Sequence, residues 1–164
     1  MLKHLKTFFN PSSKNYSYTQ PKELIISKIK EVFKEKVTLL SSNDMKGIFL
    51  SKDTFEIEII SAGYANGVKY SSSLIGEIIE TQNGRTQIKT IAKPSVALYI
   101  LFLIGIVFGI IAFYNFMQTN SFVSLFWSIV IIIGLPTFSI GFSNVAIAAI
   151  RERYKMYIDK ELKS

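Results

Sequence analysis

The sequence predicts an α+β membrane protein, in which one helix and a four-stranded antiparallel meander precede a two-helix transmembrane hairpin. Three observations predict this class. No charged residue occurs between Lys93 and Arg151. Phe55, Ile57 and Ile59 alternate with glutamates, as in a half-buried strand. The pair Asn83-Gly84 separates two apolar runs, which is a strong β-hairpin signal.

The first 20 residues form an amphipathic segment and a link. Leu2, Leu5 and Phe8 alternate with lysines at helical spacing, so this segment either rests on the inner leaflet or packs on the domain. Residues 10–15 are typical of a turn or flexible link. A helix is predicted over 21–36, since Pro21 suits its first position and apolar residues recur at helical spacing. Residues 37–40 either extend this helix or begin a strand.

The meander is predicted from Met45 onward, so that the α+β domain covers residues 21–93. A strand ends at a turn over 51–54, the alternating strand follows, and residues 61–73 form a loop. Two strands, 74–81 and 85–92, then flank the Asn-Gly turn. A two-residue turn sets Ile79 opposite Ile88 and Ile75 opposite Ala92, and brings Glu80 diagonal to Lys89. The buried set then includes Ile57, Ile59, Ile79 and Ile88.

Two apolar blocks, 95–117 and 122–149, make up the hairpin within residues 94–150. A bilayer core of about 30 Å needs about 20 helical residues, and lipid requires every backbone amide to be paired internally. Gly105 and Gly109 form a G-x-x-x-G element, which occurs by chance or lets another backbone approach closely. Its partner is the second block or a second protomer, and Pro136 should bend the second block. The predicted helix-packing residues are Gly105, Gly109, Gly134, Pro136 and Gly141.

Basic residues flank both blocks on one side, and the connecting turn has none. They are Arg85, Lys89, Lys93, Arg151, Arg153 and Lys155. This pattern predicts a membrane protein with both termini in the cytoplasm, where residues 151–164 form an amphipathic tail. The net charge of +7 makes membrane lipids the natural negative partner.

The sequence offers little for catalysis. His4 is the only histidine, cysteine is absent, and no phosphate-binding or metalloprotease motif occurs. We therefore predict no catalytic residue, cofactor or metal site, and basic residues with aromatics are too sparse for nucleic acid. No ionisable group lies inside the apolar blocks, which argues against a transporter built from this chain alone. The candidate carboxylates of an alternative enzyme are Glu56, Glu58, Glu77 and Glu80.

Several short motifs resemble a loose group of small, uncharacterised bacterial membrane proteins. They are Lys46-Gly47-Ile48, Asp53-x-Phe55-x-Ile57, Ile75-Gly76-Glu77-Ile78, Gly84-Arg85-Thr86-x-Ile88 and Pro94 before a span. The resemblance covers roughly residues 45–115. It implies a bacterial inner-membrane protein with a cytoplasmic β-rich module followed by two spans, and it brings no activity with it.

The expected function is non-enzymatic: a cytoplasmic module that binds or scaffolds an unidentified protein at the membrane surface. The predicted partner surface is Tyr64, Asn66, Lys69 and Tyr70. The alternatives are a membrane enzyme acting on lipid or peptide, an accessory subunit of a transport complex, and an immunity protein, with self-association left open. Glutamates that converge in a pocket would favour the enzyme, and an exposed apolar sheet patch would favour binding.

Overall fold

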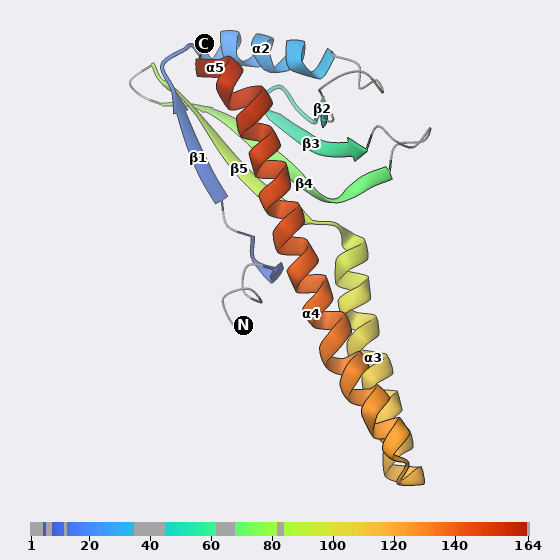
Figure 1. Ribbon diagram of the computed structural model, residues 1–164. Helices are drawn as coiled ribbons and strands as arrows, with labels where there is room; N and C mark the ends of the chain where they lie inside the picture. The colour runs from blue at the N-terminus through green and yellow to red at the C-terminus, as the bar shows by residue number, and fades with distance from the viewer. Residues whose placement is uncertain are drawn as a thin grey trace.

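The computed structural model describes residues 5, 8–11, 13–34, 45–61, 68–81 and 84–163. Five antiparallel strands form one sheet in the order β1-β5-β4-β3-β2, and the helices of the domain lie on one of its faces (Figure 1). Two long helices leave the sheet and run together away from it. The α+β class and the two apolar helices agree with the prediction, whereas the strand count and order differ.

The elements follow one another in a simple sequence. They are β1 (Ser13–Tyr18), α2 (Lys22–Lys34), β2 (Met45–Phe49), β3 (Thr54–Ser61), β4 (Val68–Glu80), β5 (Thr86–Pro94), α3 (Val96–Thr119) and α4 (Phe122–Arg153), then a π-helical turn η1 (Tyr154–Asp159) and α5 (Lys160–Lys163). α2 agrees with the predicted helix over Lys22–Lys34 and buries Ile25 and Ile29, while residues 35 and 36 lie outside the described residues. Residues 37–40 lie outside the described residues.

Strand β1 was not predicted, since residues 10–15 were interpreted as a link. It pairs antiparallel with β5 at the edge of the sheet, with Tyr16 opposite Ile88 and Tyr18 opposite Thr86. Only these two tyrosines turn toward the core, and the other β1 side chains are exposed. An edge strand with so little buried surface has almost no apolar alternation to detect.

The predicted register of the β4–β5 hairpin is wrong by one residue. Ile78, not Ile79, pairs with Ile88, and Lys89 lies opposite Glu77 rather than diagonal to Glu80. The cause is the loop: the Thr81 N–H donates to the Arg85 carbonyl at 2.8 Å, so three residues rather than two make the connection. Gly84 takes a positive φ of 67°, as the last residue of such loops commonly does.

A one-residue slip moves side chains to the other face of the sheet. Ile79 is therefore 39% exposed on the open face, contrary to the prediction, and Ile78 occupies the core. Ile57, Ile59 and Ile88 are buried, as predicted. β4 begins at Val68, inside the span predicted to be a loop.

The second apolar helix does not stop at the sheet. α4 continues through η1 and α5 to Lys163. We call its last part, residues 147–163, the C-terminal helix. It crosses the sheet in front of the strands (Figure 1) and completes the core with Ile147, Ile150, Tyr154, Ile158 and Leu162. Residues 151–164, expected as an amphipathic tail, thus belong mostly to the folded domain.

The spacing of this stripe explains the π-helical turn. Ile150, Tyr154, Ile158 and Leu162 are four residues apart, and in an α-helix of 3.6 residues per turn each such step drifts by about 40°. A π-helical turn holds more residues per turn than an α-helix. Placed at Tyr154–Asp159, it offsets the drift and keeps the stripe on the sheet.

α3 and α4 are both long and apolar enough to cross a membrane. Their seam contains Gly105 and Gly109: a Cβ at Gly105 would lie 2.8 Å from the Cβ of Leu135 and the Cδ of Pro136, and one at Gly109 would lie 2.7 Å from the Cβ of Ile132. Gly134 and Gly141 face away, since a Cβ on either would meet nothing within 4 Å. Pro136 is buried in the seam, and α4 remains helical through it.

The N-terminal segment contacts the base of this hairpin. Phe8 is fully buried against Leu98 and Ile140, and the Tyr99 hydroxyl donates to the Phe8 carbonyl at 2.9 Å. Phe9 remains 55% exposed beside them. The described part of the segment therefore packs where the two long helices leave the sheet.

Candidate functional site at the open face of the sheet

The face of the sheet opposite α2 and the C-terminal helix carries an ordered set of side chains. Directly paired residues share a face, so the strand registers define rows across the sheet. The row nearest α3 contains Lys46, Glu58, Ser73 and Lys93. The next contains Ile48, Glu56, Ile75 and Ile91, and the third contains Thr54, Glu77 and Lys89.

A groove of about 570 Å³ lies where this open face meets α3. Its polar end holds Glu56, Glu58, Ser73 and Lys93. Its other end holds Pro94, Ser95, Val96 and Ala97, at the start of α3. A smaller hollow of about 190 Å³ lies against the same two glutamates and is lined by Lys46 and Ile48. Glu56 and Glu58 line both the groove and the smaller hollow, because residues two apart on β3 point to the same face.

The groove combines complementary groups. Carboxylates accept hydrogen bonds from cationic or neutral donors, and the Lys93 ammonium with the Ser73 and Ser95 hydroxyls can donate to an anion. The first turn of α3 adds apolar surface, with Val96 71% exposed. Among the described residues, no three His, Cys, Asp or Glu side chains gather closely enough to hold a metal ion.

Only two of the four predicted carboxylates meet here. Glu77 lies on the same face, one row beyond Glu56, opposite Lys89. Glu80 follows the parity of Leu74 and Ile78, which points it to the helix-covered face. Of the predicted partner surface, Lys69 and Tyr70 lie in β4, while Tyr64 and Asn66 lie outside the described residues, as does His4. Sequence reasoning did not include Ser73, Lys93 or Ser95 in a site.

A second polar cluster joins β1 to the C-terminal helix. The Tyr18 hydroxyl donates to Asp159 Oδ1 at 2.8 Å and lies 3.2 Å from the Tyr154 hydroxyl. Lys163 Nζ pairs with Asp159 Oδ2 at 2.8 Å. Burial, together with the neighbouring Tyr154 and Asp159, raises the pKa of Tyr18 above its usual value, so the phenol stays protonated and able to donate. This cluster fastens the edge strand to the helix and faces none of the described hollows.

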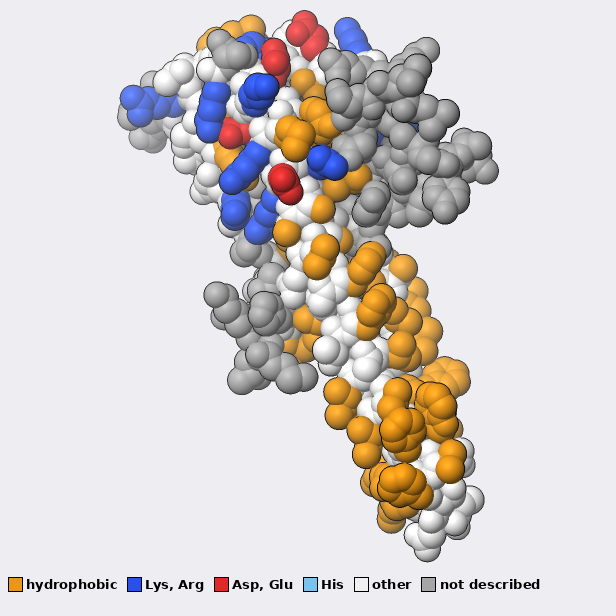
Figure 2. Space-filling view, viewed as in Figure 1, with side chains coloured by type: hydrophobic (Ala, Val, Ile, Leu, Met, Phe, Trp, Pro, Cys, Tyr) orange, Lys and Arg blue, Asp and Glu red, His pale blue; other side chains and the backbone are white. Residues whose placement is uncertain are grey.

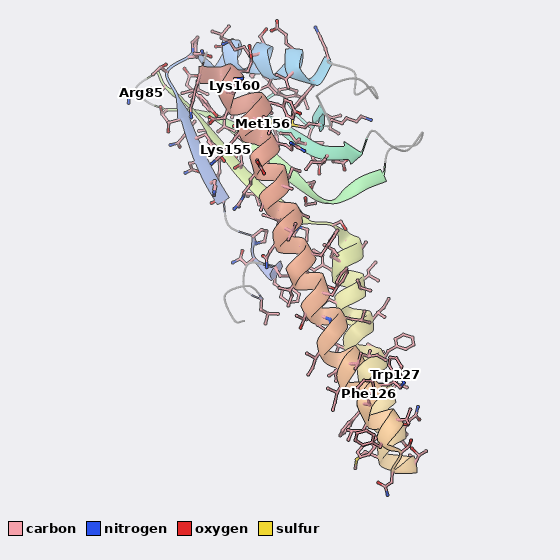
Figure 3. The ribbon with its side chains drawn as sticks, viewed as in Figure 1. Arg85, Phe126, Trp127, Lys155, Met156 and Lys160 are labelled. Atoms are coloured by element: carbon pink, nitrogen blue, oxygen red, sulfur yellow. The ribbon has the colours of Figure 1, made fainter. Side chains whose placement is uncertain are left out.

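A further hollow of about 310 Å³ separates α2 from the C-terminal helix. Met156 and Lys160 line it from the C-terminal helix (Figure 3), and Lys28 and Val32 line it from α2. Lys28 Nζ donates to the Glu161 carbonyl at 3.0 Å across it. The contact ties α2 to the last turn of the chain.

Comparison with known proteins gives no assignment. No protein-family model matches the chain. No curated protein matches it either. The crystal structure of CalU16 from Micromonospora echinospora matches with a TM-score of 0.33 and 15% identity, over 93% of this chain and 88% of that one. A likeness at this level leaves both fold and function to be argued from the chain itself.

Proposed function

We propose that the chain is a non-enzymatic protein of the bacterial inner membrane, which spans the bilayer twice and holds a binding domain at its cytoplasmic surface. One observation carries the proposal: α4 runs without a break from the apolar hairpin into the core of the sheet. β5 adds a second short connection, because only Ser95 separates it from α3. The sheet is thus held close to the membrane by two stiff connections.

The exposed surface of the hairpin supports the membrane location. Only 17% and 22% of the most apolar stretches of the two helices are buried, far less than in core helices of a soluble protein. Figure 2 shows apolar side chains over most of the hairpin and basic ones over the sheet domain. In water this large apolar surface would be exposed to solvent, whereas a bilayer would cover it.

The orientation follows from charge. Arg151 and Arg153 lie at the domain end of α4 and Lys155 follows in η1, whereas the far turn around Asn120 carries no basic residue. Phe126 and Trp127 lie toward that far end (Figure 3), where aromatic rings suit the opposite interface. β1 and the C-terminal helix belong to one domain, so both ends of a chain whose hairpin spans the membrane lie on one side.

Reporter fusions test this arrangement. We expect a reporter joined after Ser164 to be active only in the cytoplasm, and one inserted at Asn120 to be active only outside. The reversed pattern would contradict the orientation. Cytoplasmic activity from both sites would mean that the hairpin does not cross the membrane.

The open sheet face supports the binding role. Ile48 and Ile79 are 49% and 39% exposed there, on a surface that also carries glutamates and lysines. We expect a photo-crosslinking amino acid at either position to yield one protein adduct in intact cells. The same probe at Leu24, 44% exposed on α2, is the matched control and should yield no such adduct. Equal labelling from all three positions, or none from the sheet, would contradict the proposal.

A second candidate function is a membrane enzyme acting on lipid, which the shared groove of Glu56 and Glu58 favours. The purified chain in liposomes should then alter the mass of a lipid, and Glu56→Gln with Glu58→Gln should abolish the change. Lipids that stay intact through a long incubation would leave the binding role as the better account.

A further inference from the structure

We propose that the groove between the open sheet face and α3 binds the headgroup of an aminophospholipid, of which phosphatidylethanolamine is the simplest. The inference deepens the proposed function and rests on its membrane location.

The order of groups in the groove matches the order of groups in such a lipid. Val96 and Ala97 lie at the start of the span, where acyl chains would lie. Lys93, Ser95 and Ser73 come next, at the junction of helix and sheet. Glu58 lies in the same row as Lys93 but two strands away, on β3, and Glu56 lies on β3 one row farther from α3. The lipid runs from acyl chain through phosphate to amine along the same direction.

Each polar group of the lipid then meets a partner. The phosphate accepts from the Lys93 ammonium and the two serine hydroxyls, and the primary amine donates to Glu56 and Glu58. Among the described residues, Lys46, opposite Glu58, adds a second basic side chain beside the two carboxylates. Side chains of both signs suit a zwitterion, while an anionic headgroup would bring only negative charge toward the two carboxylates.

The volume is also adequate. A groove of about 570 Å³ falls within the usual range for small-molecule sites, roughly 300–1,000 Å³. Phosphatidylcholine tests the amine directly, because its trimethylated nitrogen keeps the charge but has no N–H to donate. Losing charge-assisted hydrogen bonds to two carboxylates should weaken binding on the order of tenfold.

The experiment is native mass spectrometry of the full chain in detergent, titrated with dioleoyl phosphatidylethanolamine, phosphatidylcholine or phosphatidylglycerol. We expect phosphatidylethanolamine to bind about tenfold more tightly than either of the others. The Glu56→Gln, Glu58→Gln double variant should lose its preference for phosphatidylethanolamine over phosphatidylcholine. Glu77→Gln, a glutamate on the same face outside the groove, is the matched control and should keep it.

Lys93 is tested in the same way. Lys93→Gln should weaken phosphatidylethanolamine and phosphatidylcholine alike, since both carry the phosphate, and Lys89→Gln on the same strand should change neither. Equal binding of the three lipids by the wild-type chain would overturn the proposal without any variant. Tighter binding of phosphatidylglycerol than of phosphatidylethanolamine would also overturn it. The same holds if the glutamate double variant keeps both its thermal midpoint and its preference for phosphatidylethanolamine over phosphatidylcholine.

A competition experiment with a water-soluble headgroup distinguishes binding of a lipid from binding of a free ligand. Glycerophosphoethanolamine carries the same phosphate and amine without acyl chains. We expect it to displace the lipid only weakly, because Val96 and Ala97 would go uncovered; displacement as strong as by the lipid would overturn the lipid assignment. The reporter inserted at Asn120 tests the membrane proposal alone, and the lipid titrations test the groove. A contradiction of the lipid proposal can therefore be told apart from a contradiction of the membrane proposal.

Discussion

Tyr16 and Tyr18 of β1 point to the same face of the sheet but differ in their hydroxyl partners. Tyr18 donates to Asp159 and contacts the Tyr154 hydroxyl. The Tyr16 ring packs against that of Tyr154 with centroids 4.7 Å apart, and its buried hydroxyl has no hydrogen-bond partner among the described residues. A buried acceptor that loses its donor is costly, whereas removing an unpaired hydroxyl is not.

We therefore expect Tyr18→Phe to destabilise the domain by about 1–3 kcal/mol, because Asp159 Oδ1 loses a buried donor. Tyr16→Phe is the matched control and should change stability by less than about 0.5 kcal/mol, since it removes no bond. Thermal unfolding of both variants in the same detergent measures the difference. Equal loss in the two variants would mean that the Tyr18–Asp159 bond contributes nothing.

Residue-level prediction from sequence succeeded where one strand decides the outcome and failed where two strands must be aligned. Phe55, Ile57 and Ile59 are buried as their alternation indicates. The prediction that Ile79 is buried was wrong, because the face to which its side chain points depends on one extra residue in the 82–84 loop. The groove was out of reach for the same reason: Lys93, Ser73 and Glu58 form a row only through that register.

At the scale of elements, the helix seam is set by which glycines face the partner helix. A Cβ at Gly109 would lie 2.9 Å from the Cα of Ile132, so backbone as well as side chains must move. A Cβ at Gly134 or Gly141 meets open space. The sequence singled out all of these glycines, yet spacing alone does not tell which face of the second helix turns inward.

Gly109→Ala should consequently lower the thermal midpoint in detergent, at a cost of about 1–3 kcal/mol from overpacking, with no change in apparent mass. Gly134→Ala is the control: it adds a methyl group to an open helix position, where alanine is favoured over glycine by about 0.5–1 kcal/mol. A Gly109→Ala chain that keeps its stability but changes from dimer to monomer would place the seam between protomers instead.

The C-terminal helix offers a similar contrast between neighbouring side chains. Ile158 is fully buried in the core, and Met156 is 44% exposed on the same turn. We expect Ile158→Ala to cost about 2–5 kcal/mol and Met156→Ala less than about 1 kcal/mol. Denaturation followed by circular dichroism compares them. A large loss of stability in both variants would indicate that stability depends on the helix itself and not on its packing on the sheet.

The stripe behind that prediction was visible in the sequence but was assigned to a tail. Ile150, Tyr154, Ile158 and Leu162 recur every four residues, and charged residues stand between them. Read alone, such a stripe suits a membrane surface as well as a sheet. The surface on which the stripe packs decides between the two. That surface includes Leu74, Ile78 and Ile88, which come together only when the sheet is assembled.

At the scale of the whole molecule, the apolar hairpin interrupts one folded unit. β1 to β5 and the C-terminal helix share a single core, although α3 and most of α4 lie between them in the chain. The two ends of the interruption are close together. Ser72 is paired with Pro94 across the sheet, and its hydroxyl donates to the Ala146 carbonyl at 3.0 Å.

This closeness means that the hairpin should be removable. In a chain of residues 11–94 joined to 146–164, the gap is bounded by two contacts at Ser72, and six Gly/Ser residues reach roughly 13 Å as a flexible coil. We expect this chain to be soluble without detergent, monomeric, and folded with both strand and helix, because every large core side chain of the sheet keeps its cover.

Residues 11–94 alone provide the control. They retain the strands but lack Ile150, Tyr154 and Ile158, so Leu74 and Ile88 would face water, and we expect aggregation. Gel filtration and circular dichroism of the two chains decide between the outcomes. If the joined chain also aggregates while its full-length parent is stable in detergent, the sheet requires the spans themselves, and the hairpin is part of the fold rather than an insertion in it.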